Sequence, residues 1–163
     1  MDATIVLQDG MRFVAKADSG HEVIIDSSVS GGGTDMGSRP MELLAMGLGG
    51  CTAMDVISIA TKKRQRIDAY RLEVTGDQRD DYPQVYTEIT MVHVVEGRDL
   101  SEAAIRRAIE LSATKYCPVN AMLSAGATVV HHGYRIRSTG ECQYEAAGEV
   151  VSTGPYQRPD VIT

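Results

Sequence analysis

Apolar and polar positions alternate through most of the first 25 residues. The alternation has the period of two that β-strands require, and it predicts strands at residues 4–7, 11–16 and 22–25. Asp9-Gly10 and Ser19-Gly20 lie between these segments, and such pairs are typical of tight hairpin turns. The chain is therefore expected to open with short strands joined by hairpins.

The next segment, residues 27–40, reads SSVSGGGTDMGSRP and has almost no large apolar side chains. Its glycines and serines predict a loop. A loop of this length in a small domain is either functional or disordered, and the sequence leaves both alternatives open.

A helical period replaces the alternation from Pro40 onward. Proline suits the first turn of a helix, and Glu42 follows where the helix dipole favours an acid. Apolar residues recur every three or four positions as far as Ile59, and the cations of residues 62–64 suit the last turn. The other face is also mostly apolar. The pattern thus predicts a largely buried helix over residues 40–62.

Alternation returns at residues 69–76 and 85–95, which are predicted to be strands. Asp99 stands three residues before Glu102, a spacing that resembles a capping box with aspartate as the cap. It predicts a second helix that extends to residue 116.

Pro118 should end that helix at the preceding residue and can start a new short helix itself. A last strand is predicted at residues 127–137, and the polar segment from Thr139 is expected to be loosely held. The predicted fold class is α+β with mainly antiparallel sheet. We expect one domain over residues 1–138 and a C-terminal tail over residues 139–163.

Charge and composition narrow the range of functions. The formal net charge is −6 and the pI about 5.2, whereas nucleic-acid binding requires a basic face, so no nucleic-acid partner is expected. No continuous apolar run reaches the ~18 residues of a membrane span, and the N-terminus lacks the basic start of a secretory signal. A cytoplasmic location without a membrane partner is expected. The three cysteines do not suggest a disulfide-stapled fold.

Gly47, Gly49 and Gly50 precede Cys51 on the predicted first helix. A glycine inside a helix costs about 1 kcal/mol relative to alanine, so three of them call for a reason. Either another segment packs closely on this helix, or bulk is absent so that a ligand reaches the Cys51 thiol. A single cysteine on a buried helix is more often an inert apolar side chain.

Cys117 is predicted to be the N-cap of the short helix that Pro118 begins. Helix N-termini favour the thiolate, although a purely structural cap is the alternative. Cys142 lies among polar residues and is treated as a bystander. No metal site is expected, because the cysteines and the adjacent His131 and His132 lack the short spacings of metal ligands.

The two cysteine segments, taken together, carry a family resemblance. They read PMELLAMGLGGCTAMDV around Cys51 and KYCPVNAML around Cys117. In this order and spacing they resemble the OsmC/Ohr family of osmotically induced and organic-hydroperoxide-resistance proteins, most closely an OsmC-like branch. The resemblance implies an intertwined homodimer, with antiparallel sheets wrapped around long central helices and an active site at the subunit interface.

The resemblance also implies a thiol peroxidase that needs no cofactor. Cys51 would attack the peroxide and become a sulfenic acid, and Cys117 would condense with it to a disulfide. An external dithiol, in the family a lipoylated protein, would reduce that disulfide.

Family members hold the peroxidatic thiolate with an arginine and a glutamate, and the glutamate directly follows the helix-opening proline. Here Met41 occupies that position and Glu42 is one residue further on. The arginine is either Arg12, which we favour because it lies on a predicted strand, or Arg39 beside the helix start.

An apolar substrate pocket is expected from four residues near the two motifs, namely Met41, Gly47, Leu48 and Met122. Such a lining would favour organic peroxides over hydrogen peroxide. The alternative function is a non-catalytic dimer of the same fold that binds a small apolar ligand in its interface cleft.

Overall fold

A computed structural model of the chain describes residues 1–154. Contacts divide the chain into two units, residues 1–46 and the part that starts at Gly47. The boundary falls inside the first long helix, so that helix begins in one unit and continues in the other.

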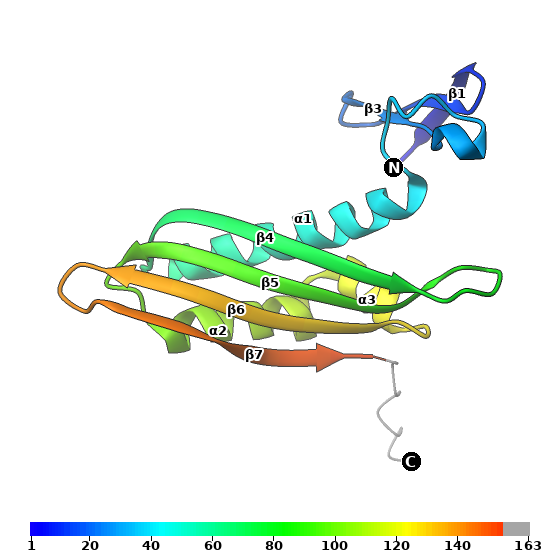
Figure 1. The fold of residues 1–163 in the computed structure, drawn as a ribbon. Helices are drawn as coiled ribbons and strands as arrows, with labels where there is room; N and C mark the ends of the chain where they lie inside the picture. The colour runs from blue at the N-terminus through cyan, green and yellow to red at the C-terminus, as the bar shows by residue number, and fades with distance from the viewer. Residues whose placement is uncertain (155–163) are drawn as a thin grey trace, which may run out of the picture. The chain divides into compact units, whose positions relative to one another are not determined.

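The first unit is built on a three-stranded antiparallel sheet. Its strands are β1 (Ala3–Asp9), β2 (Arg12–Ala17) and β3 (Glu22–Ile25), in the order β1-β2-β3 (Figure 1). Gly10 and Gly20 adopt positive φ angles of 56° and 80° in the two hairpin turns. All three strands and both turns predicted from the sequence are confirmed.

Asp26 organises the glycine- and serine-rich loop that follows β3. Its side chain is almost fully buried. The carboxylate accepts hydrogen bonds from the backbone N–H groups of Ser27, Thr34 and Met36 at 2.7 to 3.1 Å, and from the Thr34 hydroxyl at 2.7 Å. These donors, with the Thr34 hydroxyl foremost, lower the pKa of Asp26 to about 2. The loop, which includes a short 3-10 turn η1 (Val29–Gly31), is thus ordered by one buried acid.

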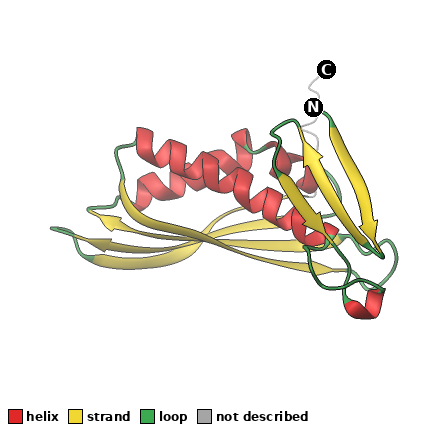
Figure 2. Ribbon diagram, turned by 90° about the horizontal axis from the view of Figure 1, so that it is seen from above, coloured by secondary structure: helices red, strands yellow, loops and turns green. Residues whose placement is uncertain are grey.

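The second unit has two layers, a four-stranded sheet with helices on one face (Figure 2). The strands, in spatial order, are β4 (Arg66–Gln78), β5 (Tyr86–Arg98), β6 (Val129–Thr139) and β7 (Tyr144–Thr153). β5 and β6 run parallel, and the other neighbours are antiparallel. The parallel pair requires a long crossover, which the helices between these strands supply. The α+β class with mainly antiparallel sheet is confirmed.

Four helical segments accompany this sheet: α1 (Pro40–Lys62), α2 (Glu102–Leu111), the π-helical turn η2 (Ser112–Tyr116) and α3 (Pro118–Ser124). The predicted bounds of α1 and the predicted break at Cys117 are confirmed. Gly49 allows α1 to approach the sheet, because a Cβ atom there would lie 3.2 Å from Val74 Cγ2. Close packing therefore explains one of the three helix glycines.

The prediction that α1 is largely buried is wrong for the single chain. Only one stripe of α1 is buried, namely Leu48, Gly49, Thr52, Val56 and Ala60. Met54 on another face is 72% exposed. By length and composition alone, α1 is also apolar enough to cross a membrane, a test that core helices of soluble proteins pass too.

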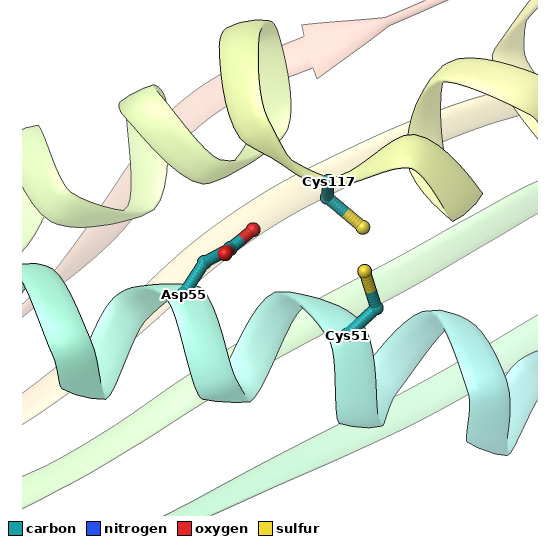
Figure 3. Close-up of side chains that lie close together, drawn as sticks. All are labelled: Cys51, Asp55 and Cys117. Atoms are coloured by element: carbon teal, nitrogen blue, oxygen red, sulfur yellow. The ribbon is translucent and has the colours of Figure 1, made fainter.

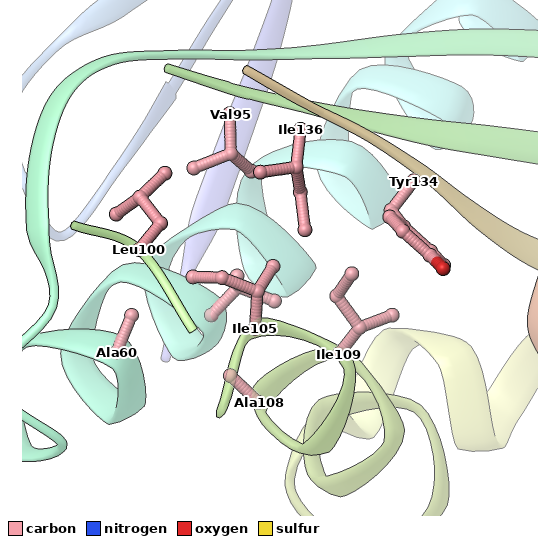
Figure 4. Packing of buried hydrophobic residues seen from close by; sticks show 9 residues of the cluster. Ala60, Val95, Leu100, Ile105, Ala108, Ile109, Tyr134 and Ile136 are labelled. Carbon is pink, nitrogen blue, oxygen red and sulfur yellow. The ribbon is translucent and has the colours of Figure 1, made fainter. Parts of the chain in front are cut away.

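A hydrophobic core fills the space between the sheet and the helices of the second unit (Figure 4). Ile105 and Ile109 of α2 meet Val95 of β5 and Ile136 of β6, and Val56 of α1 joins the same cluster. All five side chains are at most 3% exposed. Alternate residues of β5 and β6 face this core, as the period-two pattern requires.

Two sequence-based expectations need correction. Ser101, not Asp99, is the N-cap of α2, and its hydroxyl accepts from the backbone N–H of Ala104. Asp99 has a positive φ of 47°, and its carboxylate accepts instead from the backbone N–H groups of Glu141 and Cys142. The same contacts anchor the turn after β6.

The second correction concerns the segment from Thr139, which was expected to be loosely held. In the described part of this segment, up to residue 154, most residues form a strand. Residues Tyr144–Thr153 form β7, which pairs along β6. Tyr144 and Ala146 also pack against the hydrophobic core. The rest of the predicted tail, residues 155–163, lies outside the described residues.

Candidate active site

Two cysteines that are far apart in the sequence come together on the helix side of the second unit. Cys51 lies on α1 and is half-buried, and Cys117 lies at the start of α3 (Figure 3). Their Sγ atoms are within 4.8 Å of each other, and each cysteine is a free thiol. The fold therefore brings together the two cysteines of the two motifs.

Cys117 is the N-cap of α3, as the sequence predicted. The backbone turns from extended geometry at Cys117 into the helix at Pro118, and the Cys117 Sγ accepts from the backbone N–H of Asn120 at 3.3 Å. The Thr52 hydroxyl of α1 donates to the same sulfur at 3.5 Å. With only 3% of its surface exposed, Cys117 is fixed in direction by hydrogen bonds from two elements.

Asp55 completes the cluster. It lies one helical turn after Cys51, and a carboxylate oxygen is within 4.8 Å of both sulfur atoms (Figure 3). The fully buried Ser112 donates from its hydroxyl to Asp55 Oδ2 at 3.1 Å, which holds the carboxylate in place. The turn of π-helix η2 that begins at Ser112 thus positions the acid beside the thiols.

The environment of Cys51 favours the neutral thiol. Burial raises the pKa of Cys51 to about 11, and the hydrogen bond shared with the Cys117 thiol adds to the rise. A hydrogen bond from the backbone N–H of Val119 acts in the opposite direction, and the charge of Asp55 contributes a further, smaller increase. At neutral pH the Cys51 thiol is therefore mostly protonated, unless a nearby cation stabilises its thiolate.

The predicted activating residues all belong to the first unit. Arg12 opens β2. The Arg39 guanidinium pairs with Asp35 and donates to the Gly37 carbonyl. Glu42 Oε2 accepts from the backbone N–H of Arg39 at 2.9 Å, which is the contact of a capping box. Arg39 and Glu42 therefore both have local structural partners.

The four predicted pocket residues have unequal surroundings. Leu48 is fully buried, so it does not line an open cleft in the single chain. Gly47 faces open space, and Met122 on α3 is 68% exposed. Met41 is half-buried in the first turn of α1.

Cys142 is exposed and lies in the turn between β6 and β7. Among the described residues, one group of three or more potential metal ligands lies within 4.8 Å, and it consists of Cys51, Asp55 and Cys117. The histidines considered with the cysteines in the sequence are not part of it.

A buried polar network behind Cys117 was missed by the sequence analysis. His132 Nε2 is 3.2 Å from Asn120 Oδ1, and the backbone N–H of the same asparagine donates to Cys117. The ring of His132 stacks on that of His93, whose Nδ1 is 2.7 Å from the Tyr70 hydroxyl. The alternating pattern of apolar and polar residues on β5 and β6 could have placed both histidines on the inner face of the sheet. It could not have predicted that they lie next to α3.

The second nitrogens of the two rings, His93 Nε2 and His132 Nδ1, are buried with no hydrogen-bond partner among the described residues. Burial lowers the pKa of His93 to about 3 and that of His132 to about 4. Both rings are consequently neutral at physiological pH.

The fold and the facing thiols define a class of small α+β proteins with a cysteine pair between a long helix and a helix N-terminus. Residues 32–132 match the family model described as OsmC-like protein, and the chain belongs to this family, as its two motifs indicated. Protein YhfA of Escherichia coli strain K12 is 37% identical over 131 residues, which cover 80% of this chain and 95% of YhfA.

Solved structures agree with this assignment. An OsmC-like protein from Mycoplasma pneumoniae has a TM-score of 0.72 at 21% identity, over 83% of this chain and 95% of that chain. An organic hydroperoxide resistance protein from Elizabethkingia anophelis, with thiocyanate bound, has a TM-score of 0.62 at 16% identity, over 84% of this chain and 94% of that chain. The structural likenesses show the shared fold.

Proposed function

We propose that this protein is a thiol-dependent peroxidase that reduces organic hydroperoxides. The observation that carries the proposal is the convergence of the Cys51 and Cys117 sulfur atoms to within 4.8 Å from two separate elements. A disulfide requires the two sulfurs to close to ~2.05 Å, so a small shift of one side chain brings them together.

The reaction has two steps in which atoms and electrons balance. The Cys51 thiolate attacks the peroxide oxygen, the O–O bond breaks, and one proton completes the alcohol product while Cys51 becomes a sulfenic acid. The Cys117 thiol then attacks the Cys51 sulfur, a disulfide forms, and the sulfenic hydroxyl leaves as water. An external dithiol, such as a lipoylated protein, reduces the disulfide by exchange and is itself oxidised.

The first step needs a thiolate, and the local environment of Cys51 opposes it. We therefore propose that a cation stabilises the reacting thiolate, and Arg12 is the preferred candidate because Arg39 already pairs with Asp35. Glu42 would act by orienting that arginine. A family-type homodimer, with the active site at the interface, would offer such residues from either chain.

Steady-state consumption of cumene hydroperoxide with dihydrolipoamide as the reductant tests the function. We expect turnover in the wild type and none in Cys51→Ser, whereas Cys142→Ser, which alters an exposed thiol outside the pair, should behave like the wild type. Arg12→Ala should lower the rate at least tenfold relative to Arg39→Ala. An unchanged rate in Cys51→Ser would rule out the proposed chemistry.

A non-catalytic dimer that binds a small apolar ligand is the second candidate. The raised pKa of Cys51 favours it, because a thiol that stays protonated does not attack peroxides efficiently. Absence of turnover with cumene hydroperoxide, together with saturable binding of an apolar fluorescent probe to the folded protein, would support this alternative.

A further inference from the structure

We propose that Cys51, Asp55 and Cys117 form, in the reduced protein, a binding site for a thiophilic divalent cation such as Zn²⁺. The proposal concerns the same residues as the proposed peroxidase but does not depend on peroxide chemistry. It makes the cation a competitor of peroxide for the two sulfur atoms.

The three donor atoms already approach the spacing of a zinc site. Zn–S bonds of ~2.3 Å in a tetrahedron place two sulfurs about 3.8 Å apart, and a carboxylate oxygen about 3.5 Å from each sulfur. The donor atoms of the cluster all lie within 4.8 Å of one another. Closing the cluster around a cation therefore requires movements of about 1 Å, within the reach of side-chain rotations.

The donors are also held from separate directions, which distinguishes a site from loose thiols. Cys51 and Asp55 are spaced i,i+4 on α1 and so share one face of that helix. Cys117 approaches from the start of α3 and is fixed by hydrogen bonds from Asn120 and Thr52. The Ser112 hydroxyl orients the carboxylate of Asp55 from η2, as an outer-shell partner does for a metal ligand.

The chemistry of the set selects the type of cation. Two thiolates with one carboxylate suit Zn²⁺ and similar borderline or soft ions rather than Mg²⁺ or Ca²⁺, which prefer oxygen donors. Binding would replace the two thiol protons by the metal and release them to solvent. Three protein donors leave the fourth tetrahedral position to water.

This site would couple the metal to the redox state of the pair. A bound cation would occupy both sulfurs and so block sulfenic acid formation at Cys51. A disulfide between Cys51 and Cys117 would remove two of the three donors, so the oxidised protein would release the metal.

Cobalt absorption tests the proposal without any peroxide. Reduced full-length protein that carries Cys142→Ser is titrated with Co²⁺ under argon, and thiolate-to-cobalt charge transfer is followed in the near ultraviolet. We expect one Co²⁺ per chain, displaced by Zn²⁺. Asp55→Asn should weaken the affinity at least tenfold, while Asp68→Asn, an exposed acid on β4, should leave it unchanged.

The two proposals fail separately in these experiments. A missing charge-transfer band in protein that is folded by circular dichroism would overturn the metal site, whatever the peroxidase activity. So would a band that persists after Cys51→Ser, or an affinity that Asp55→Asn does not change. Cobalt binding in a protein without peroxide turnover would support the metal site and refute the peroxidase.

Discussion

The thiol of Cys51 and the thiol of Cys117 have different environments although they are neighbours. Cys117 is buried and accepts hydrogen bonds from Asn120 and Thr52, whereas Cys51 is half-buried and shares a hydrogen bond with Cys117. Two hydrogen-bond donors direct the sulfur of Cys117 toward its partner. Reactivity at Cys51 is instead limited by how much thiolate it carries.

The pH dependence of Cys51 follows from its pKa of about 11. Below that value the thiolate fraction rises tenfold per pH unit, and the alkylation rate should rise with it. In protein that carries Arg12→Ala, Cys117→Ser and Cys142→Ser, and so lacks the proposed activating cation, we expect iodoacetamide to modify Cys51 with a rate that still increases above pH 9. A rate that levels off near neutral pH in this protein would contradict the raised pKa.

The buried histidines predict a loss of stability in acid. Their pKa values in the folded chain, about 3 and 4, lie below the ordinary 6.5, so the unfolded chain binds up to two more protons as the pH falls through 6.5. Each proton lowers the free energy of unfolding by ~1.4 kcal/mol per pH unit as the pH falls from about 6 to about 4. This loss should be fully absent above pH 7.

Urea unfolding at a series of pH values measures that slope. His93→Gln removes one titrating group and should reduce the slope by about half. Equal slopes in the wild type and His93→Gln would contradict the account.

At the level of the elements, most helices and strands could be predicted from periodicity, and the errors have local physical causes. Asp99 has the spacing of a cap, but its positive φ and its hydrogen bonds to the next turn assign it another role. The polar edge strand β7 gave a weak strand signal, since it draws its order from β6 through backbone hydrogen bonds. The hydrogen bonds that the buried Asp26 accepts within its loop produce no periodic pattern in the sequence, so periodicity could not predict them.

The candidate site shows the same limit. Cys51 and Cys117 lie close together because the strands and helices between α1 and α3 bring α3 back beside α1. The number of residues between the two cysteines does not reveal this proximity. The family motifs indicated the pair, and physical reasoning alone predicted only the N-cap at Cys117. The buried histidine network behind that cap could not be found without the fold.

The capping role of Cys117 can be separated from its chemistry. Serine is a good N-cap and alanine is not, so Cys117→Ala should lower the free energy of unfolding by about 1 kcal/mol relative to Cys117→Ser. Chemical denaturation of the two variants measures the difference. Equal stabilities would mean that the hydrogen bond from Asn120 to the sulfur contributes nothing to α3.

For the whole molecule, the part of α1 in the second unit leaves a large apolar side chain open. Met54 on this part of the helix is 72% exposed in the single chain. Exposed apolar side chains of this size are often covered when proteins associate, and a second copy of the chain would cover this one. We therefore expect the homodimer that is typical of the family.

Light scattering coupled to size exclusion should give a mass near twice the 17.6 kDa of one chain. Met54→Asp, which introduces a charge on the exposed face of α1, should shift the protein toward the monomer. Thr87→Asp, at an exposed position of β5, is the matched control and should remain dimeric. A monomeric wild type at micromolar concentration would contradict this assembly.

The central claim is that Cys51 and Cys117 are a redox pair, and peptide mapping after oxidation tests it most directly. The reduced Cys142→Ser protein is treated with one equivalent of cumene hydroperoxide, alkylated and digested without reductant. We predict a linked peptide that joins Cys51 to Cys117, one equivalent of cumyl alcohol, and in Cys117→Ser a Cys51 sulfenic acid that dimedone traps. Two freely alkylated cysteines and unconsumed peroxide would contradict the account.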